Sequence, residues 1–436
     1  MKQEEAFEIL KTGNNVFLTG EAGSGKTYLL QKYIDFLEDK GVKTAITAST
    51  GIAATHIDGV TIHSWSGMGV NNTLSDRDIS HLLDRKYLHK HFDGTRVLII
   101  DEVSMLTANQ LDMIDRICKA FKESKLPFGG MQVVLSGDFY QLPPVSKQKN
   151  TDFVFKSHIW RDMDIKVCYL TDQFRHKDSD LYKLLSKIRS NSIDKKARQY
   201  LNKRSEIKHD EENITRLYTH NKDVDKINLR KLEDLNTNSF EYKMSSKGDS
   251  KLVDILKKNC LAKEKLILKK GAYVMFIKNN FDKGYVNGTL GKIVAFKDIT
   301  NYPVVETESG DKITVTPKKW KLKEAGEIKA EVEQIPLKLA WAITVHKSQG
   351  MSLDKAEIDL RKCFIKGMGY VALSRLRCLE GLYLKGFNKK SLLVDQKISK
   401  IDKKLRSKSK DVLSLLNDKD EEALHNIQQD FIQSSV

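Results

Sequence analysis

Cysteine is scarce and scattered in this sequence, with five residues in 436 and no CxxC pair among them. The five are Cys118, Cys168, Cys260, Cys363 and Cys378. Neither a zinc ribbon nor a disulfide framework fits that spacing. We therefore expect reduced thiols in a cytosolic compartment.

Long apolar runs are also missing, and none approaches the roughly 20 residues of a membrane-spanning helix. The first residues are charged and helical in character, unlike a secretory signal. Internal repeats and low-complexity tracts are absent from the sequence. These absences predict a soluble, cytoplasmic protein (nucleoid-associated if bacterial) that has no membrane partner.

Acidic residues are too few to balance the basic ones. The chain has 74 Lys plus Arg against 58 Asp plus Glu, a formal net charge of +16. A polyanion, most often nucleic acid, is a reasonable partner for such a chain. A soluble lysine-rich surface would give the same excess, so charge alone leaves both interpretations open.

Short apolar runs alternate with helix-like segments over the first 175 residues. Several runs are apolar at consecutive positions, as strands buried on both faces require. The runs cover residues 15–20, 43–50, 96–102, 131–138 and 166–175. This alternation predicts a doubly wound α/β domain built on a parallel sheet.

The rest of the chain predicts a second core and a small β insertion. Residues 176–230 are helical and basic, and strand signals dominate 266–337. Turns at Asn287-Gly288 and at 309–311 favour a small antiparallel barrel inserted into the second core. The expected limits are 1–175 for the first core, 176–289 and 338–390 for the second, 290–337 for the barrel and 391–436 for a basic helical C-terminal region.

The segment GEAGSGKT at residues 20–27 fits the P-loop pattern G-x-x-x-x-G-K-[ST]. It follows an apolar strand and opens a helix, which is the context that supports such a match. Backbone amides there cradle phosphates, and we expect Lys26 to reach the β- and γ-phosphates. The candidate ATP-binding residues are Gly20, Glu21, Ala22, Gly23, Ser24, Gly25, Lys26, Thr27 and Tyr28.

Two consecutive acids end the apolar run RVLIIDE. We expect Asp101 to act on Mg²⁺ through water, together with Thr27, and Glu102 to polarise the attacking water. A surface turn is the alternative, but four apolar residues followed by Asp-Glu suit a strand end better. With the P-loop, this pair makes ATP hydrolysis the leading hypothesis.

A third strand, MQVVLSGDFYQLPPV, ends abruptly because prolines cannot continue a central strand. Gln141 could hydrogen-bond a γ-phosphate without charge repulsion, although a loop glutamine is usually only a polar loop residue. Arg175 and Arg375 could contact the γ-phosphate and couple closure of the cores to ATP state. For either arginine alone, a surface salt bridge is the simpler interpretation.

Seven segments, in order, resemble the motif series of superfamily-one helicases, and most closely the Pif family of DNA helicases. They are GEAGSGKT, TASTGIAATHIDGVTIHSW, DEVSM, LPFGGMQVVLSGDFYQLPPV, LTDQFR, ITVHKSQGMSLD and YVALSR. The stretches LPFGG and DEVSMLTANQLDMIDRICKAF resemble that family's region between its second and third motifs. RecD-like and Dda-like helicases share the ATP motifs but fit this region less well. The resemblance covers about residues 3–387.

The resemblance implies two RecA-like cores, a barrel of the Src-homology-three type and a small wedge near residues 64–75. It also implies that Gln3 reads adenine, that Gln141 senses phosphate, and that Arg175 and Arg375 contact phosphate. The implied contacts to single-stranded DNA are Thr50, Gly51, His63, Thr344, His346, Lys347, Ser348 and Gln349.

The function implied by the resemblance is that of an ATP-dependent, 5′-to-3′ DNA helicase, with ATP and Mg²⁺ as cofactors. Single-stranded DNA and duplex junctions would be its partners, with G-quadruplexes or DNA–RNA hybrids as further substrates, in repair, recombination or genome maintenance. We expect a monomer on DNA. Two alternatives stay open: a RecD-like subunit of a repair complex, and a P-loop ATPase switch that unwinds nothing.

Overall fold

The chain folds into two compact units, which we describe separately. The computed structural model describes residues 1–69, 73–144, 152–174, 179–207, 214–260, 262–278, 280–285, 288–307, 309–324 and 327–435. Unit 1 comprises Met1–Lys177, Arg189–Asn191 and Val394–Val436, and unit 2 comprises Asp178–Ile188 and Ser192–Leu393. In these ranges no helix is both long enough and apolar enough to cross a bilayer.

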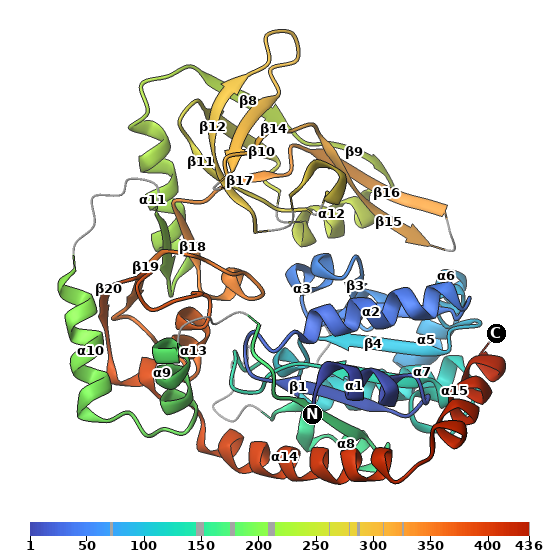
Figure 1. The fold of residues 1–436 in the computed structure, drawn as a ribbon. Helices are drawn as coiled ribbons and strands as arrows, with labels where there is room; N and C mark the ends of the chain where they lie inside the picture. Colours follow the sequence, from blue (N-terminus) through green and yellow to red (C-terminus); the bar gives the residue numbers. More distant parts are fainter. Residues whose placement is uncertain are drawn as a thin grey trace. The chain divides into compact units, whose positions relative to one another are not determined.

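A six-stranded parallel sheet, ordered β3-β2-β4-β5-β1-β6, forms the centre of unit 1 (Figure 1). Its strands are β1 (Val16–Gly20), β2 (Thr44–Ala48), β3 (Val60–Thr61), β4 (Val97–Asp101), β5 (Gln132–Ser136) and β6 (Lys166–Leu170). Every residue of β1, β4 and β5 is buried, as consecutive apolar positions require. Each of the five apolar runs contains one strand, so the predicted parallel α/β sheet is confirmed.

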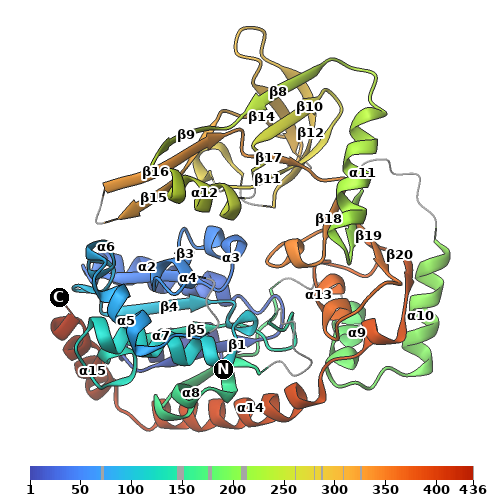
Figure 2. The same ribbon diagram turned by 180° about the vertical axis from the view of Figure 1, so that it is seen from behind.

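Helices cover both faces of this sheet. α1 (Gln3–Leu10) and α2 (Lys26–Asp39) lie on the face toward the viewer in Figure 1, and α7 (Ala108–Phe121) lies on the face toward the viewer in Figure 2. Alternate strand residues such as Val16 and Leu18 pack with α1 and α2 in one core. The shorter helices of unit 1 are α3 (Gly51–His56), α4 (Ile62–Trp65), α5 (Asp76–Leu83), α6 (Lys86–Phe92), α8 (His158–Asp162), η1 (Val103–Met105), η2 (Pro127–Gly130) and η3 (Val154–Lys156).

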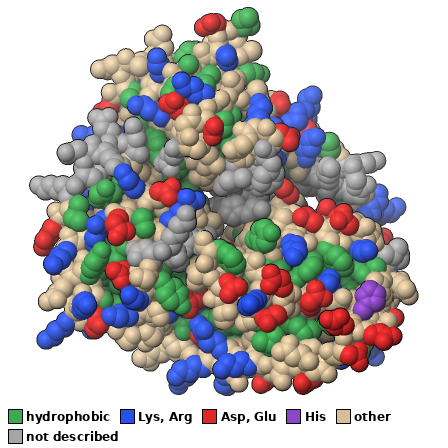
Figure 3. All heavy atoms as spheres, viewed as in Figure 1, with side chains coloured by type: hydrophobic (Ala, Val, Ile, Leu, Met, Phe, Trp, Pro, Cys, Tyr) green, Lys and Arg blue, Asp and Glu red, His purple; other side chains and the backbone are tan. Residues whose placement is uncertain are grey.

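The C-terminal helices α14 (Gln396–Asn417) and α15 (Glu421–Ser435) return to unit 1. Val412, Leu416 and Phe431 pack against the same core as α1 and α2. The Tyr169 amide of β6 donates to Ser409 Oγ of α14 at 3.0 Å. The region predicted as a separate helical C-terminus is therefore helical but part of the first unit, although Lys and Arg side chains do gather over the N-terminal part of α14 (Figure 3).

Unit 2 contains a second parallel sheet, ordered β18-β7-β19-β20. Its strands are β7 (Thr215–Tyr218), β18 (Ala342–Thr344), β19 (Ala356–Leu360) and β20 (Leu382–Phe387). The accompanying helices are α9 (Ser179–Arg189), α10 (Lys195–Glu206), α11 (Asn221–Glu233), α13 (Met368–Leu373), η5 (His346–Ser348) and η6 (Lys389–Leu392). The predicted second parallel-sheet core is thus present.

The β insertion of unit 2 begins earlier than predicted. Its largest sheet is antiparallel and runs β14-β13-β12-β11-β17, and two smaller sheets run β15-β16-β9 and β10-β8. The elements are β8 (Ser239–Lys243), β9 (Ser245–Gly248), α12 (Ser250–Asn259), β10 (Lys265–Lys269), β11 (Tyr273–Phe276), η4 (Phe281–Lys283), β12 (Leu290–Phe296), β13 (Pro303–Thr307), β14 (Lys312–Thr314), β15 (Lys318–Glu324), β16 (Glu327–Gln334) and β17 (Leu337–Leu339). The expected boundary at 290 is wrong because it divides the antiparallel pair β11–β12. Closure of the sheet into a barrel stays a prediction.

The Pro-Phe-Gly-Gly turn before β5 has a packing role that the sequence did not reveal. Phe128 is fully buried, and its amide donates to Asp115 Oδ1 of α7 at 2.7 Å. Gly129 has φ +69°, and a Cβ there would lie 2.5 Å from Lys122 Cβ and 2.8 Å from the Cys118 carbonyl oxygen. The turn therefore fixes the C-terminal half of α7 against the entrance to β5.

Gly129→Ala should lower the free energy of unfolding by at least about 2 kcal/mol, because it adds a steric clash to a left-handed backbone. Gly41→Ala is the matched control: its φ is +72° but nothing lies within 4 Å of the added Cβ. That control should cost only about 1 kcal/mol in urea unfolding. Equal losses for the two variants would contradict the packing role of Gly129.

Candidate nucleotide-binding site

The three ATP motifs follow strands that are neighbours in the sheet of unit 1. Leu135 of β5 is paired with Ile100 of β4 on one side and with Phe17 of β1 on the other. Carboxyl ends of parallel strands meet at one edge, which is where such sheets bind ligands. The structure therefore brings together the P-loop after β1, Asp101 and Glu102 after β4, and the turn that carries Gln141 after β5.

The P-loop has the backbone that its glycines permit. Gly23 and Gly25 have φ of +87° and +81°, and Gly25 is the N-cap of α2. Lys26 Nζ donates to the carbonyl oxygens of Gly20 and Glu21, at 3.0 Å each. The lysine is thus folded back over its own loop.

The loop presents groups that suit an anion. Ser24 is fully buried, and no partner for its Oγ is found in the described part of the chain. Burial lowers the pKa of Lys26, while the carboxylates of Asp138, Glu102 and Asp101 act in the opposite direction. A bound phosphate would satisfy the buried hydroxyl and favour the charged lysine.

Asp101 and Glu102 are held tightly at the end of β4. Asp101 is 6% exposed, and its Oδ1 accepts from the Glu102 amide at 2.8 Å. Glu102 has φ +53°, a left-handed conformation that costs a non-glycine residue about 1–2 kcal/mol. Ser49 Oγ donates to the Glu102 carbonyl oxygen at 2.7 Å and so helps to hold it. Strain of this kind is typical of functional positions.

The fit of Mg²⁺ depends on the nucleotide. Among the described residues no group of three His, Cys, Asp or Glu side chains could hold a metal ion. Mg²⁺ at a phosphate site usually takes one or two protein oxygens and completes its shell with phosphates and water. Thr27, which is exposed, and Asp101 supply that kind of incomplete set.

Gln141 is 6% exposed and sits on a turn organised by Asp138. The Gln141 amide donates to the Asp138 carbonyl oxygen at 3.0 Å, and the Tyr140 amide donates to Asp138 Oδ1 at 3.0 Å. Pro143 and Pro144 follow after Leu142. The turn is therefore well defined, and phosphate sensing by Gln141 stays a prediction.

Gln3, expected to read adenine, lies against the P-loop. Its Nε2 donates to the carbonyl oxygens of Gly25 at 3.2 Å and Ser24 at 3.4 Å. Tyr28 is 69% exposed on the first turn of α2. The structure thus places both residues at the loop, although it does not assign either to the base.

Of the two candidate arginines, the structure describes Arg375. Arg175 lies outside the described residues. Arg375 of unit 2 is 1% exposed, so a surface salt bridge is excluded. Its Nε donates to the Val371 carbonyl oxygen at 3.0 Å, and its Nη1 to those of Ser348 and Met351 at 3.4 Å each. It therefore supports the loop that carries the expected DNA contacts of unit 2.

The expected DNA contacts of unit 1 lie at short helices after β2 and β3. Thr50 caps α3 by accepting from the Ala53 amide at 3.2 Å, and Gly51 begins that helix. His63 Nε2 lies 3.2 Å from Gln110 Nε2, and burial lowers the pKa of His63. The proposed wedge near 64–75 includes residues 70–72, which lie outside the described ranges.

The expected contacts of unit 2 follow β18. Thr344 Oγ1 accepts from the Lys347 amide at 3.3 Å, and Ser348 Oγ donates to the Val345 carbonyl oxygen at 2.8 Å. Ser348 and Gln349 are buried, whereas Lys347 is exposed and His346 half-buried. Burial lowers the pKa of His346. Thr344 and Ser348 thus shape the loop, and Lys347 is the side chain it presents to solvent.

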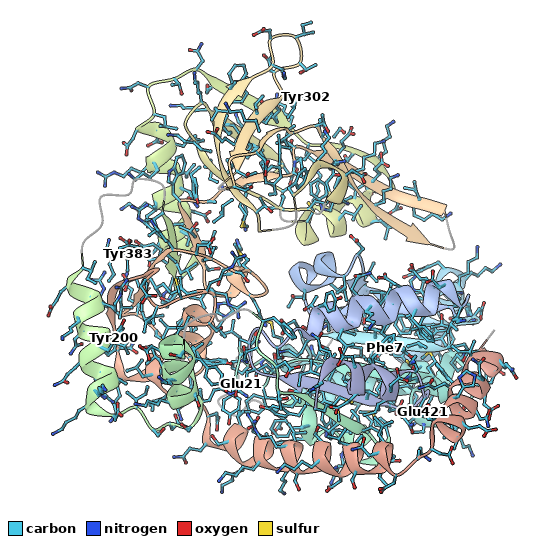
Figure 4. The ribbon with its side chains drawn as sticks, in the orientation of Figure 1. Phe7, Glu21, Tyr200, Tyr302, Tyr383 and Glu421 are labelled. Atoms are coloured by element: carbon cyan, nitrogen blue, oxygen red, sulfur yellow. The ribbon has the colours of Figure 1, made fainter. Side chains whose placement is uncertain are left out.

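Sequence patterns gave no sign of a charged cluster beside the P-loop. Arg189 is 5% exposed and pairs with Asp138, while Arg406 of α14 pairs with Glu21 (labelled in Figure 4). Asp402 lies between the two arginines. No local pattern could reveal the Arg189–Asp138 and Arg406–Glu21 pairs, because their members are separated by 51 and 385 positions in the chain.

Comparison with known proteins identifies relatives along the whole chain. A family model described as PIF1-like helicase matches residues 2–198, and one described as DNA helicase Pif1, 2B domain, matches residues 251–296. A Psychrobacter protein named ATP-dependent DNA helicase Pif1 is 41% identical, over all of this chain and 75% of that protein.

Solved structures agree with these matches. The Pif1 helicase of Candida albicans is 34% identical with a TM-score of 0.78, covering 92% of this chain and 98% of that one. A Bacteroides Pif1 helicase in complex with ADP-AlF3 and single-stranded DNA is 31% identical with a TM-score of 0.65, covering 93% and 96%.

Acidification should destabilise unit 1 partly through His63. Because burial lowers its pKa in the folded chain, the unfolded chain binds more protons below the usual value of 6.5. Stability should therefore fall as pH drops, and His63→Gln should reduce the loss of melting temperature between about pH 7.5 and 5.5. The exposed His81 provides the control substitution, His81→Gln. An unchanged slope for His63→Gln would contradict this assignment.

Proposed function

Because this chain belongs to the PIF1-like helicase family, we propose that it is an ATP-dependent DNA helicase that moves 5′ to 3′ along single-stranded DNA. The observation that carries the proposal is the meeting of the P-loop, Asp101–Glu102 and Gln141 at one edge of one sheet. The DNA-bound Bacteroides relative and the net charge of +16 support DNA as the partner.

The residues at the sheet edge divide the work of phosphoryl transfer. Lys26 leaves its loop carbonyls for the β- and γ-phosphates, and Glu102 accepts the proton of the attacking water. Gln141 hydrogen-bonds the γ-phosphate or that water without adding charge. Mg²⁺ held by Thr27 and Asp101 supplies positive charge to the phosphate oxygens when it is bound. The resemblance also implies that Arg375 and Arg175 contact phosphate, and we keep both as predicted phosphate-contacting arginines.

Movement along DNA needs contacts that hold a strand without reading its sequence. Phosphate contacts meet that need, and the loops at Thr50–Gly51 and His346–Gln349 are where we place them. The protein works as a cytoplasmic monomer on forked or tailed duplexes. G-quadruplexes and DNA–RNA hybrids met during repair and recombination are its further substrates.

Glu102→Gln should reduce kcat for ATP hydrolysis by about 10²-fold or more, because it removes the base but keeps the side chain's size. Binding of a fluorescent ATP analogue should change by less than about threefold. Glu123→Gln is the matched control, since Glu123 is an exposed glutamate with a similar φ of +49°. Hydrolysis at the wild-type rate in Glu102→Gln would remove Glu102 from the mechanism.

Unwinding should depend on the tail of the substrate. Duplexes with a single-stranded 5′ tail should open in the presence of ATP, while 3′-tailed and blunt duplexes should stay closed. Lys26→Ala should leave all three substrates closed, since it removes the phosphate-binding ammonium. Opening of only the 3′-tailed duplex would refute the polarity, and ATP hydrolysis without any unwinding would favour a switch ATPase.

A further inference from the structure

A cluster of charges centred on the buried Arg189 joins four segments of unit 1 beside the P-loop. Arg189 closes α9, and its Nη1 donates to Asp138 Oδ1 and Oδ2 at 3.2 and 3.0 Å. Its Nη2 donates to the Tyr169 hydroxyl at 2.9 Å and to Asp402 Oδ1 at 3.5 Å. The guanidinium also lies 3.9 Å from the ring centroid of Tyr140. Both Nη atoms of Arg189 and the face of its guanidinium group therefore make contacts in the cluster.

Arg406 of α14 extends the cluster to the P-loop. Its Nη2 donates to Glu21 Oε1 at 3.3 Å and to the Tyr169 hydroxyl at 2.6 Å, and its Nε donates to Asp402 Oδ2 at 2.9 Å. The Tyr169 hydroxyl in turn donates to Asp402 Oδ1 at 2.9 Å. Arg189 Nε is also 3.8 Å from Glu21 Oε1. The two arginines thus share Glu21, Asp402 and Tyr169.

The two carboxylates at the ends of the cluster belong to the ATP motifs. Glu21 directly follows Gly20, the first glycine of the P-loop, and the Glu21 carbonyl oxygen accepts from Lys26 Nζ at 3.0 Å. Asp138 organises the turn that carries Gln141 through its carbonyl oxygen and its carboxylate. Displacement of Glu21 would therefore affect Lys26, and displacement of Asp138 would affect the turn that carries Gln141.

Arg189 and Asp138 are buried and Glu21 and Asp402 are half-buried, and removing charges from water costs free energy that ion pairing does not always return. Such a cluster is better suited to fixing geometry than to adding stability. Arg189 also sits where the chain enters unit 1 for only three residues, Arg189–Asn191, between two stretches of unit 2. Asn191 is anchored there by hydrogen bonds to the Val394 amide and carbonyl, at 2.9 and 3.1 Å.

We propose that Arg189 and Arg406 are positioning residues for ATP hydrolysis, and that α14 is thereby a working part of the ATPase. Together they hold Glu21 and Asp138 in register, so that the P-loop and the Gln141 turn respond to the nucleotide as one body. This inference rests on the proposed ATPase function. In this proposal α14 positions side chains of the ATP site, whereas a basic helix could instead serve only to raise the affinity for DNA.

Substitutions of Arg406 and Lys404, both on α14, can distinguish a role of this helix in positioning the ATP site from a role in DNA affinity. Arg406 is committed to Glu21 and Asp402, with 42% of its side-chain surface exposed. Lys404 is exposed, and the described residues offer it no hydrogen bond or ion pair. A role of α14 in DNA affinity would make the two positions equivalent, whereas a role in positioning would affect Arg406 alone.

The first test compares Arg406→Met with Lys404→Met in the full chain. With saturating single-stranded DNA, Arg406→Met should lower kcat for ATP by about tenfold while KM for ATP changes less than about threefold. Lys404→Met should retain the wild-type kcat. DNA affinity measured by fluorescence anisotropy should be the same for both variants. Equal kcat values for the two variants, or a loss explained by weaker DNA binding, would overturn the proposal.

A second pair of variants guards against simple unfolding. Arg189→Lys keeps the buried charge but loses the fork that reaches both Asp138 and Asp402, and Asp402→Asn keeps the size of the acid that joins the two arginines. Both should melt within a few degrees of wild type yet show the same fall in kcat. If they hydrolyse ATP normally, the cluster is only structural. An inactive wild-type protein would instead refute the ATPase function itself.

Discussion

The parallel pairing of β5 between β4 and β1 is the constraint on which the candidate site depends. Leu135 is in register with Ile100 on one side and Phe17 on the other, and all three side chains are fully buried. A slip by one residue would turn every side chain of β5 to the other face of the sheet. Lys26, Glu102 and Gln141 would then no longer meet at the same edge, so the apolar core fixes the geometry of the chemistry.

The same edge carries backbone strain and a buried hydroxyl without a described partner. Glu102 is left-handed, Ser24 Oγ is buried without a described partner, and Lys26 is folded onto loop carbonyls among three carboxylates. An anion bound at the P-loop would accept a hydrogen bond from Ser24 Oγ and favour the charged form of Lys26. In unit 2, Arg375 donates to the carbonyl oxygens of Ser348 and Met351, so it supports the loop in which DNA contacts are predicted.

Those parts of the fold that depend on local residue patterns could be predicted from the sequence. Buried strands read as continuous apolar runs, and the P-loop was identified by its place between β1 and α2. The boundary at 290 failed because β12 pairs with the earlier strand β11, and pairing is not a local property. Phe128 and Gly129 were conspicuous, but Asp115, which accepts from the Phe128 amide, lies 13 residues earlier on α7. Arg189, Asp402 and Arg406 were invisible because only the folded chain brings them to Glu21 and Asp138.

We propose that one edge of the sheet in unit 1 assembles the ATP-hydrolysing site. A crystal structure of this chain with ADP, aluminium fluoride and Mg²⁺ tests it most directly. Lys26 Nζ and the Gln141 side chain should lie within hydrogen-bonding distance of the fluoride, Thr27 and Asp101 at the metal, and Glu102 beside the water in line for attack. A nucleotide bound away from Glu21–Lys26, or a Glu102 carboxylate turned away from that water, would contradict it.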